Sequence, residues 1–137
     1  NTGTLSKALK ELGIVRTSQC NRTAYWLASH TAICQRPGWT DALAKALKDA
    51  GSGSTFSEAE KAAIHLAEVM TLYPHGYTAE DFERLRSFYS EGEVVELMAA
   101  IGLFNYFNRF NDLLQMDPTQ PASAQELAKA GVAPATA

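Results

Sequence analysis

Apolar residues recur at intervals of three and four positions along most of the chain, which is the spacing of one face of an α-helix. No segment shows the strict alternation of apolar and polar residues that is typical of a half-buried β-strand. We therefore predict an all-α fold. The expected helices cover residues 5–15, 23–34, 40–51, 58–73, 79–88 and 91–114.

Three of these helices are preceded by residues that can cap their first turn. Ser57 and Glu60 have the spacing of a capping box, in which the serine hydroxyl accepts from a backbone N–H and the glutamate reaches back to the cap. Thr78 with Asp81 repeats this spacing, and Ser90 precedes the last long helix. We therefore expect helices to begin directly after these three residues.

Glycine and proline mark the breaks. Gly13 weakens the first predicted helix near its end by about 1 kcal/mol relative to alanine, and Pro37-Gly38 ends the second. The sequence GSGST at residues 51–55 is a flexible connector, since too little chain precedes it to form a domain. We expect one domain over residues 1–116 and a weakly ordered tail, residues 117–137, with at most a short helix.

The last long helix carries apolar residues on most of its sides. They are Val94, Val95, Leu97, Met98, Ile101, Leu103, Phe104, Phe107, Phe110 and Leu113. A helix that is apolar nearly all round is buried in a core or shared with another subunit. Because a chain of 137 residues has little interior in which to bury such a helix, we expect an oligomer.

Composition and charge narrow the classes of partner. With 46% hydrophobic and 20% charged residues the chain is typical of a globular protein, and no apolar run is long enough for a membrane span. A net charge of −3 gives no electrostatic reason to expect nucleic acid or an acidic membrane as a partner. We take a cytoplasmic location as the default expectation.

The residues best suited to chemistry are concentrated between positions 11 and 36. Glu11 lies on the first predicted helix, and Tyr25, Trp26 and His30 lie on the second. Between them, residues 18–22 form a polar cluster of the kind that ends one helix and caps the next. No other segment places a carboxylate, an imidazole, two aromatic rings, an arginine and a thiol so close together, so this stretch is the predicted active site.

This stretch resembles the signature of the carboxymuconolactone decarboxylase and AhpD-like (alkyl hydroperoxidase D) superfamily. In that signature a glutamate is followed twelve positions on by Cys-x-x-Cys, and a histidine stands four positions beyond the second cysteine. The matching residues are Leu9-Lys10-Glu11-Leu12, Arg16, Ser18, Gln19, Asn21, Tyr25 and His30-Thr31, with later matches at residues 56–60, Ala67-Glu68, Thr78 and residues 105–109. The resemblance implies an AhpD-like helical fold that assembles as a homotrimer or hexamer.

Both redox positions of the signature differ here. Thr23 stands in place of the first cysteine and Trp26 in place of the second. The resemblance therefore indicates a member without the redox pair. Decarboxylases of the superfamily work without that pair, although the glutamate of their Tyr-Glu-Trp segment is missing from Tyr25-Trp26-Leu27.

Because the two redox cysteines of the signature are absent, Glu11 and His30 are the residues left to act as a general acid–base unit. An imidazole held by a carboxylate can exchange a proton near neutral pH. We predict that His30 exchanges a proton with a small organic acid or lactone while Glu11 orients the ring. Arg16 would bind a substrate carboxylate. Asn21 would donate to a developing oxyanion, and Tyr25 and Trp26 would form an apolar wall. The prediction involves no cofactor and no metal.

Two other functions remain open. A thiol peroxidase would need a reactive thiolate, for which Cys20 is the candidate nearest the signature. A binding or assembly protein would have its pocket closed by Trp26. Structural roles also compete with functional ones, since Arg16 can pair a nearby acid, Asn108 and Arg109 can tie the last helix to its neighbours, and His65 and His75 are expected to be solvated.

Overall fold

The computed structural model describes residues 3–22, 45–50 and 53–116. Within these ranges the chain forms helices and no β-strand, which confirms the all-α prediction for this part of the protein. The helices are α1 (Lys7–Asn21), α4 (Glu58–Leu72), α5 (Ala79–Arg86) and α6 (Glu91–Leu113), with short 3-10 helices η1 (Leu47–Asp49) and η2 (Pro74–Gly76). The predicted helix at 23–34, the start of the one at 40–51 and the tail at 117–137 lie outside the described residues.

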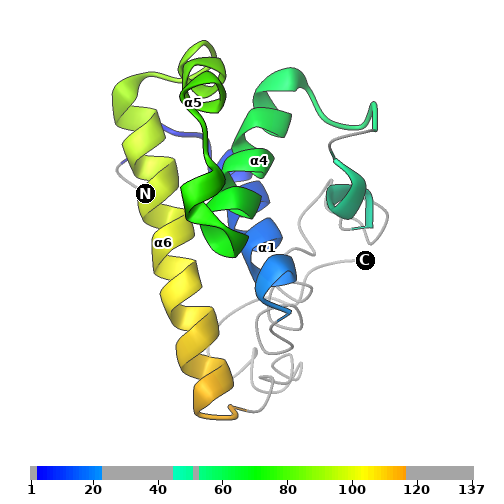
Figure 1. Cartoon of the computed structure of the whole chain (residues 1–137), viewed down its shortest axis with the longest axis vertical. Coiled ribbons are helices and arrows are strands. Elements are labelled where there is room, and N and C mark those ends of the chain that lie inside the picture. The colour runs from blue at the N-terminus through cyan, green and yellow to red at the C-terminus, as the bar shows by residue number, and fades with distance from the viewer. Residues whose placement is uncertain (1–2, 23–44, 51–52, 117–137) are drawn as a thin grey trace, which may run out of the picture.

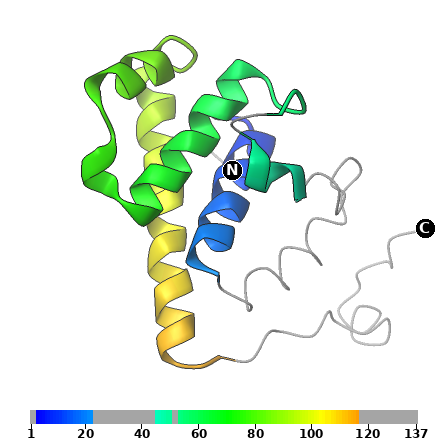
Figure 2. The ribbon, with the colours of Figure 1, turned by 45° about the vertical axis from the view of Figure 1, so that its right-hand side comes forward.

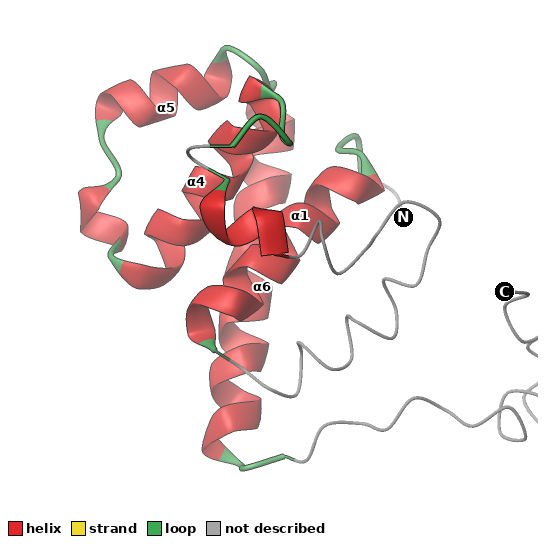
Figure 3. Cartoon of the chain, turned by 90° about the vertical axis from the view of Figure 1, so that its right-hand side faces the viewer, coloured by secondary structure: helices red, strands yellow, loops and turns green. Residues whose placement is uncertain are grey.

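Helix α1 is the centre of the arrangement, because it packs against both α4 and α6 (Figures 1 and 2). Helix α6 is the longest of the described helices, and its C-terminal end extends beyond α1 and α4 in both views. Short loops join α4, α5 and α6 (Figure 3). The core between them is formed mainly by aliphatic side chains, including Leu12, Leu47, Ile64, Leu85, Leu97 and Ile101.

The predicted helix starts after Ser57, Thr78 and Ser90 are confirmed. In each case the hydroxyl of the cap accepts from the backbone N–H three residues on, and the acidic residue at that position accepts from the backbone N–H of the cap. The latter N···O distances are 2.8 Å for Ser57–Glu60, 3.0 Å for Thr78–Asp81 and 2.9 Å for Ser90–Glu93. These capping boxes use donors that would otherwise have no partner within the helix.

The capping box of α5 predicts a loss of stability in acid. Hydrogen bonds from the backbone N–H and then the hydroxyl of Thr78 hold the pKa of Asp81 below its usual value. A carboxyl with a lowered folded-state pKa stabilises the fold fully above its unfolded pKa of about 4, and this contribution is lost as the pH falls through the folded value. We expect urea unfolding to show a free energy of unfolding that falls below about pH 4, with a shallower fall in Asp81→Asn. An unchanged slope in that variant would exclude this cap as a source of acid sensitivity.

Helix α1 is longer than predicted. It continues through the polar cluster to Asn21 and ends at Arg22, which has a left-handed backbone (φ 58°, ψ 30°). The prediction that residues 18–22 link two helices is therefore wrong for residues 18–21. The hydroxyls of Thr17 and Ser18 donate to the carbonyls of Gly13 and Ile14 (2.8 and 3.1 Å), so these polar side chains are satisfied within the helix.

Gly13 lies where α1 crosses α6, and its role is packing. A Cβ atom at this position would lie 3.2 Å from Leu97 Cδ1 and 3.6 Å from Ile101 Cγ1, so the two helices approach closely because Gly13 has no side chain. The cost of glycine in a helix is thus offset by burial of the two aliphatic side chains against it.

Enlarging Gly13 should therefore destabilise the fold, unlike enlarging a glycine on a free surface. We expect Gly13→Val to lower the free energy of unfolding by about 1–3 kcal/mol through overpacking. Gly92 in α6 is the matched control, because a Cβ there would meet nothing within 4 Å. Gly92→Ala should raise stability by up to about 1 kcal/mol. Equal effects of the two substitutions in urea unfolding would contradict this packing role.

Helix α6 divides into an inner and an outer face. Its inner face is apolar in the first half, where Val94, Leu97 and Ile101 are buried, and amide-bearing in the second half, where Asn105, Asn108 and Asn111 are buried. We call the opposite side the outer face of α6 and define it by Val95, Met98, Leu103, Tyr106, Phe110 and Leu113. All six of these side chains are exposed, and Leu113 retains 83% of its accessible surface. The prediction of a helix that is apolar nearly all round is therefore correct for the first half of α6 only, because the inner face of the second half carries buried amides.

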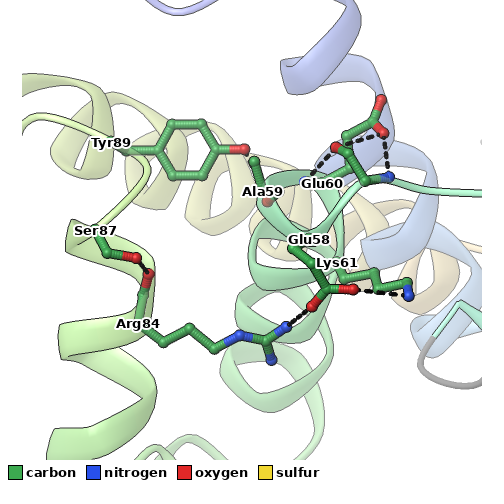
Figure 4. A network of polar contacts seen from close by, with 8 residues as sticks. Glu58, Ala59, Glu60, Lys61, Arg84, Ser87 and Tyr89 are labelled. Atoms are coloured by element: carbon green, nitrogen blue, oxygen red, sulfur yellow. Dashed lines mark hydrogen bonds and ion pairs between the residues drawn. The ribbon is translucent and has the colours of Figure 1, made fainter.

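Polar contacts hold the start of α4 against α5 and the loop that follows it (Figure 4). The Glu58 carboxylate pairs with Arg84 at 2.6 Å and with Lys61 at 3.0 Å. The Tyr89 hydroxyl donates to the carbonyl of Ala59 at 2.8 Å, and burial raises the pKa of Tyr89 to about 12. This corner of the molecule is therefore organised by structural pairs among its own residues.

Candidate active site

Glu11, the predicted carboxylate of the site, lies in the middle of α1. Its side chain is half-buried, and its Oε2 atom is buried. Helical spacing places Val15 and Ser18 on the same line of α1 as Glu11, four and seven positions further on. Both are fully or nearly fully buried. The carboxylate is therefore carried on a side of α1 that is largely shielded from water.

His30, Tyr25 and Trp26 lie outside the described residues, as does Cys34. Glu11, Arg16 and Asn21 are described, and all three lie on α1. The described part of the candidate site is therefore α1 from Glu11 onward, with the residues of α4 and α6 that contact it.

Arg16 forms an ion pair across the α1–α4 contact. Its Nε and Nη2 atoms lie 2.7 and 2.6 Å from Glu68 Oε1, and its Nη1 donates to Gln19 Oε1 at 3.1 Å. The pairing with an acid agrees with the structural alternative given for Arg16 above. A substrate carboxylate at Arg16 would have to compete with Glu68 for the guanidinium.

Asn21 is held from α6. Its Nδ2 donates to Asn105 Oδ1 at 2.9 Å, and Asn105 Nδ2 in turn donates to Thr71 Oγ1 on α4 at 3.1 Å. One turn earlier on α1, Ser18 Oγ accepts a hydrogen bond from Asn108 Nδ2 at 3.3 Å. We call Ser18, Asn21, Thr71, Asn105 and Asn108 the polar seam, since they connect the three helices through side-chain hydrogen bonds.

The polar seam was not predicted from the sequence, although the spacing of the asparagines in α6 indicates part of it. Asn105, Asn108 and Asn111 follow one another at intervals of three on a helix whose other residues are mostly apolar. Such spacing places their amides on one side of the helix. Most of the seam lies inside the protein, because Ser18 and Asn108 have no exposed surface and Thr71 retains 6%, whereas Asn21 is half-buried. The prediction that Asn108 and Arg109 tie α6 to its neighbours is confirmed, and Arg109 donates to the Thr71 carbonyl at 3.4 Å.

Cys20 lies within α1 and is half-buried, not in a connecting turn. Burial raises its pKa, the nearby Arg16 lowers it and Glu68 raises it again, with a net upward shift. The side chain therefore favours the neutral thiol over the thiolate that attack on a peroxide requires.

His65 has a partner, contrary to the expectation of a solvated side chain. Its Nε2 lies 3.2 Å from Asp81 Oδ1, and its ring lies 5.9 Å from that of Tyr77. His65 and Asp81 line a hollow of about 240 Å³ between α4 and α5. Because Asp81 also caps α5, this contact joins the two helices and has a structural explanation.

Two further features, a cluster of metal ligands and a membrane-spanning helix, are absent from the described part of the chain. Residues 3–22, 45–50 and 53–116 contain no group of three or more His, Cys, Asp or Glu side chains placed to hold a metal ion. Among the helices of these ranges, none combines the length and the apolar character required to cross a membrane.

Comparison with known proteins gives a consistent set of relatives. The model of the Carboxymuconolactone decarboxylase family matches residues 2–69. Uncharacterized protein YdfG of Bacillus subtilis (strain 168) is 30% identical over 108 residues, which are 78% of this chain and 74% of that protein.

Two solved structures are similar in fold. The first is ATU0492 from Agrobacterium tumefaciens, a protein of unknown function that its description links to the antioxidant defence protein AhpD. It has a TM-score of 0.78 and 22% identity over 85% of this chain and 81% of that one. The second is the debrominase Bmp8 without ligand, with a TM-score of 0.74 and 22% identity over 85% of this chain and 63% of that one. These likenesses indicate an AhpD-like fold.

Proposed function

Because the chain belongs to the carboxymuconolactone decarboxylase family, we propose that it carries out cofactor-independent acid–base chemistry on a small organic acid or lactone. His30 exchanges the proton with the substrate, and Glu11 orients the imidazole and stabilises its charged form. The reaction is of the decarboxylation or isomerisation type. The observation that supports the proposal best is the position of Glu11, a carboxylate with a buried oxygen at the centre of α1.

The remaining predicted residues have supporting roles in this proposal. Arg16 binds the substrate carboxylate in exchange for its pairing with Glu68, since guanidinium matches a carboxylate in two-point geometry. Asn21 donates an amide hydrogen to the oxyanion that develops as the proton moves. Tyr25 and Trp26 provide the apolar wall against which the substrate lies.

A thiol peroxidase is the second candidate, and it draws support from the name AhpD attached to one structural relative. The raised pKa of Cys20 weighs against it, because a buried neutral thiol is a poor nucleophile. The other structural relative is named a debrominase. Since one fold can carry unrelated reactions, we place more weight on the residues of this chain than on either name.

The two enzymatic candidates can be separated by one set of assays. The purified protein would be given five-membered lactones that carry a carboxylate and, separately, an alkyl hydroperoxide with a dithiol reductant. We expect turnover of a lactone that is lost in His30→Ala and retained in Cys20→Ala. Peroxide turnover that is lost in Cys20→Ala would instead establish the peroxidase. A protein inactive in both assays would favour the binding or assembly alternative.

We also propose that the protein is a homo-oligomer assembled through the outer face of α6. Exposed aromatic and aliphatic side chains line this face along the helix. A contiguous apolar patch on the surface of a protein commonly marks a site of interaction with another protein. A trimer or a hexamer would bury this face against other copies of the chain.

Charge placed on the outer face of α6 should dissociate the oligomer. We expect Phe110→Asp to reduce the mass measured by sedimentation velocity to that of the monomer, because the carboxylate would have to be desolvated in the interface. Phe82→Asp on α5 is the matched control, since Phe82 has similar exposure outside α6. A wild-type protein that sediments as a monomer, or a Phe110→Asp variant that keeps the wild-type mass, would contradict the proposed interface.

A further inference from the structure

The polar seam contains a residue that the proposed function does not yet use. We propose that Asn105 is a positioning residue, which fixes the orientation of the Asn21 amide, the proposed oxyanion donor, through its hydrogen bonds to Asn21 and Thr71. This inference rests on the proposed function, because it assigns Asn105 a role in the same site. Asn105 does not itself contact the reacting atoms.

The hydrogen bonds of Asn105 connect both ends of its amide to other helices. Its oxygen accepts from Asn21 Nδ2 at 2.9 Å, and its nitrogen donates to Thr71 Oγ1 at 3.1 Å. An amide is planar and carries its acceptor and donor on opposite sides. If Asn105 turned over alone, two nitrogen donors would face each other across the contact with Asn21. The orientation of Asn21 is therefore coupled to that of Asn105 and, through it, to the hydroxyl of Thr71.

Burial makes this coupling strong. Asn105 and Thr71 retain 8% and 6% of their accessible surface, so water does not readily replace a lost partner. A buried polar group left without a partner costs about 1–3 kcal/mol, which favours the connected arrangement over the others. Asn21 is half-buried, so the buried pair of Thr71 and Asn105 favours one arrangement of the Asn21 amide.

The position of Asn21 connects this arrangement to the proposed chemistry. Asn21 is the last residue of α1, and Arg22 ends the helix in a left-handed conformation. The same turn is held a second time by the bond between Asn108 and Ser18, and Ser18 shares its line of α1 with Glu11. Helix α6 thus fixes the end of α1 at two points, directly before the segment that contains His30.

Thr71 offers a test that leaves Asn105 and Asn21 unchanged. Thr71→Val has nearly the same shape but no hydroxyl, whereas Thr71→Ser keeps the hydroxyl and serves as the rescue variant. Thr17→Val is the matched control, because the Thr17 hydroxyl is buried and bonds only to the Gly13 carbonyl among the described contacts. Each variant would be examined by NMR of the Asn21 side-chain amide and of the His30 imidazole, and by turnover of the lactone found in the substrate assays.

We expect Thr71→Val to shift both sets of resonances and to lower kcat by about 10-fold or more through misplacement of the donor. Thr71→Ser and Thr17→Val should resemble the wild type in all three measurements. Asn21 resonances that stay in place in Thr71→Val would overturn the inference. So would Asn21 resonances that move while His30 and kcat remain those of the wild type. If no substrate is turned over, the proposed reaction fails, and the two NMR measurements still decide the positioning role.

Discussion

Replacing Glu11 with glutamine is expected to lower kcat/KM by about 10²–10⁴-fold, the usual contribution of general acid–base catalysis. Glutamine keeps the size of the side chain but removes the negative charge that, in the proposed mechanism, stabilises the imidazolium form of His30. The apparent pKa of His30 should fall for the same reason, and NMR titration of the imidazole would measure it without a substrate.

The effect of Glu11→Gln should be specific to the site. Glu93→Gln makes the same chemical change at the start of α6, where the side chain serves as a cap and a glutamine can also fill that role. We expect its kcat/KM to stay within about twofold of the wild type, since a cap acts on stability and not on a proton transfer. A Glu11→Gln variant with wild-type turnover and an unchanged His30 pKa would remove Glu11 from the mechanism.

The largest expected loss of stability comes from Leu97, which retains 1% of its accessible surface in the core next to Gly13. Leu97→Ala should lower the free energy of unfolding by about 2–5 kcal/mol, through lost burial and the cavity left behind. Urea unfolding monitored by circular dichroism would measure this difference.

Leu114 provides the matched control for that substitution. It is the C-cap residue of the same helix and retains 56% of its accessible surface. Leu114→Ala should change the free energy of unfolding by less than about 0.5 kcal/mol. Similar losses in the two variants would contradict the difference in burial between these two positions.

The features that the sequence predicted well are those determined by neighbouring residues. The capping boxes at Ser57 and Thr78 depend on contacts across three positions, so the starts of α4 and α5 could be derived from spacing alone. The same holds for the apolar stripe of α4, in which Ala63 and Ile64 are buried as expected. Local chemistry therefore determined most of the helix boundaries between residues 57 and 114.

Features that depend on distant residues were not predicted. Asn21, at the end of the extended α1, bonds to Asn105, which lies 84 positions away, and nothing near residue 18 indicates that partner. His65 was expected to be solvated because Asp81 stands 16 positions further on in another helix. The division of α6 into two faces has the same origin, since apolar residues on both sides cannot show which side meets α1.

The candidate site shows the same limit in its chemistry. Sequence reasoning selected Glu11, Arg16 and Asn21 by residue type and register, and all three lie on α1. It could not supply the residues that hold them, because Glu68 and Asn105 come from α4 and α6. The residues that bind substrate can be proposed from a sequence, whereas those that orient them become visible only when the helices are placed together.

The pairing of α1 with α6 also affects how the protein can fold during synthesis. The contacts of Leu5 with Glu96 and of Ser18 with Asn108 join residues 91 and 90 positions apart. At about 5–20 residues per second, a ribosome would release α1 roughly 5–20 s before its partner on α6. During that interval the apolar side of α1 has no α6 to cover it and can be bound by a chaperone. Translation through the asparagines of α6 is therefore the step that allows the first helix of the chain to reach its final place.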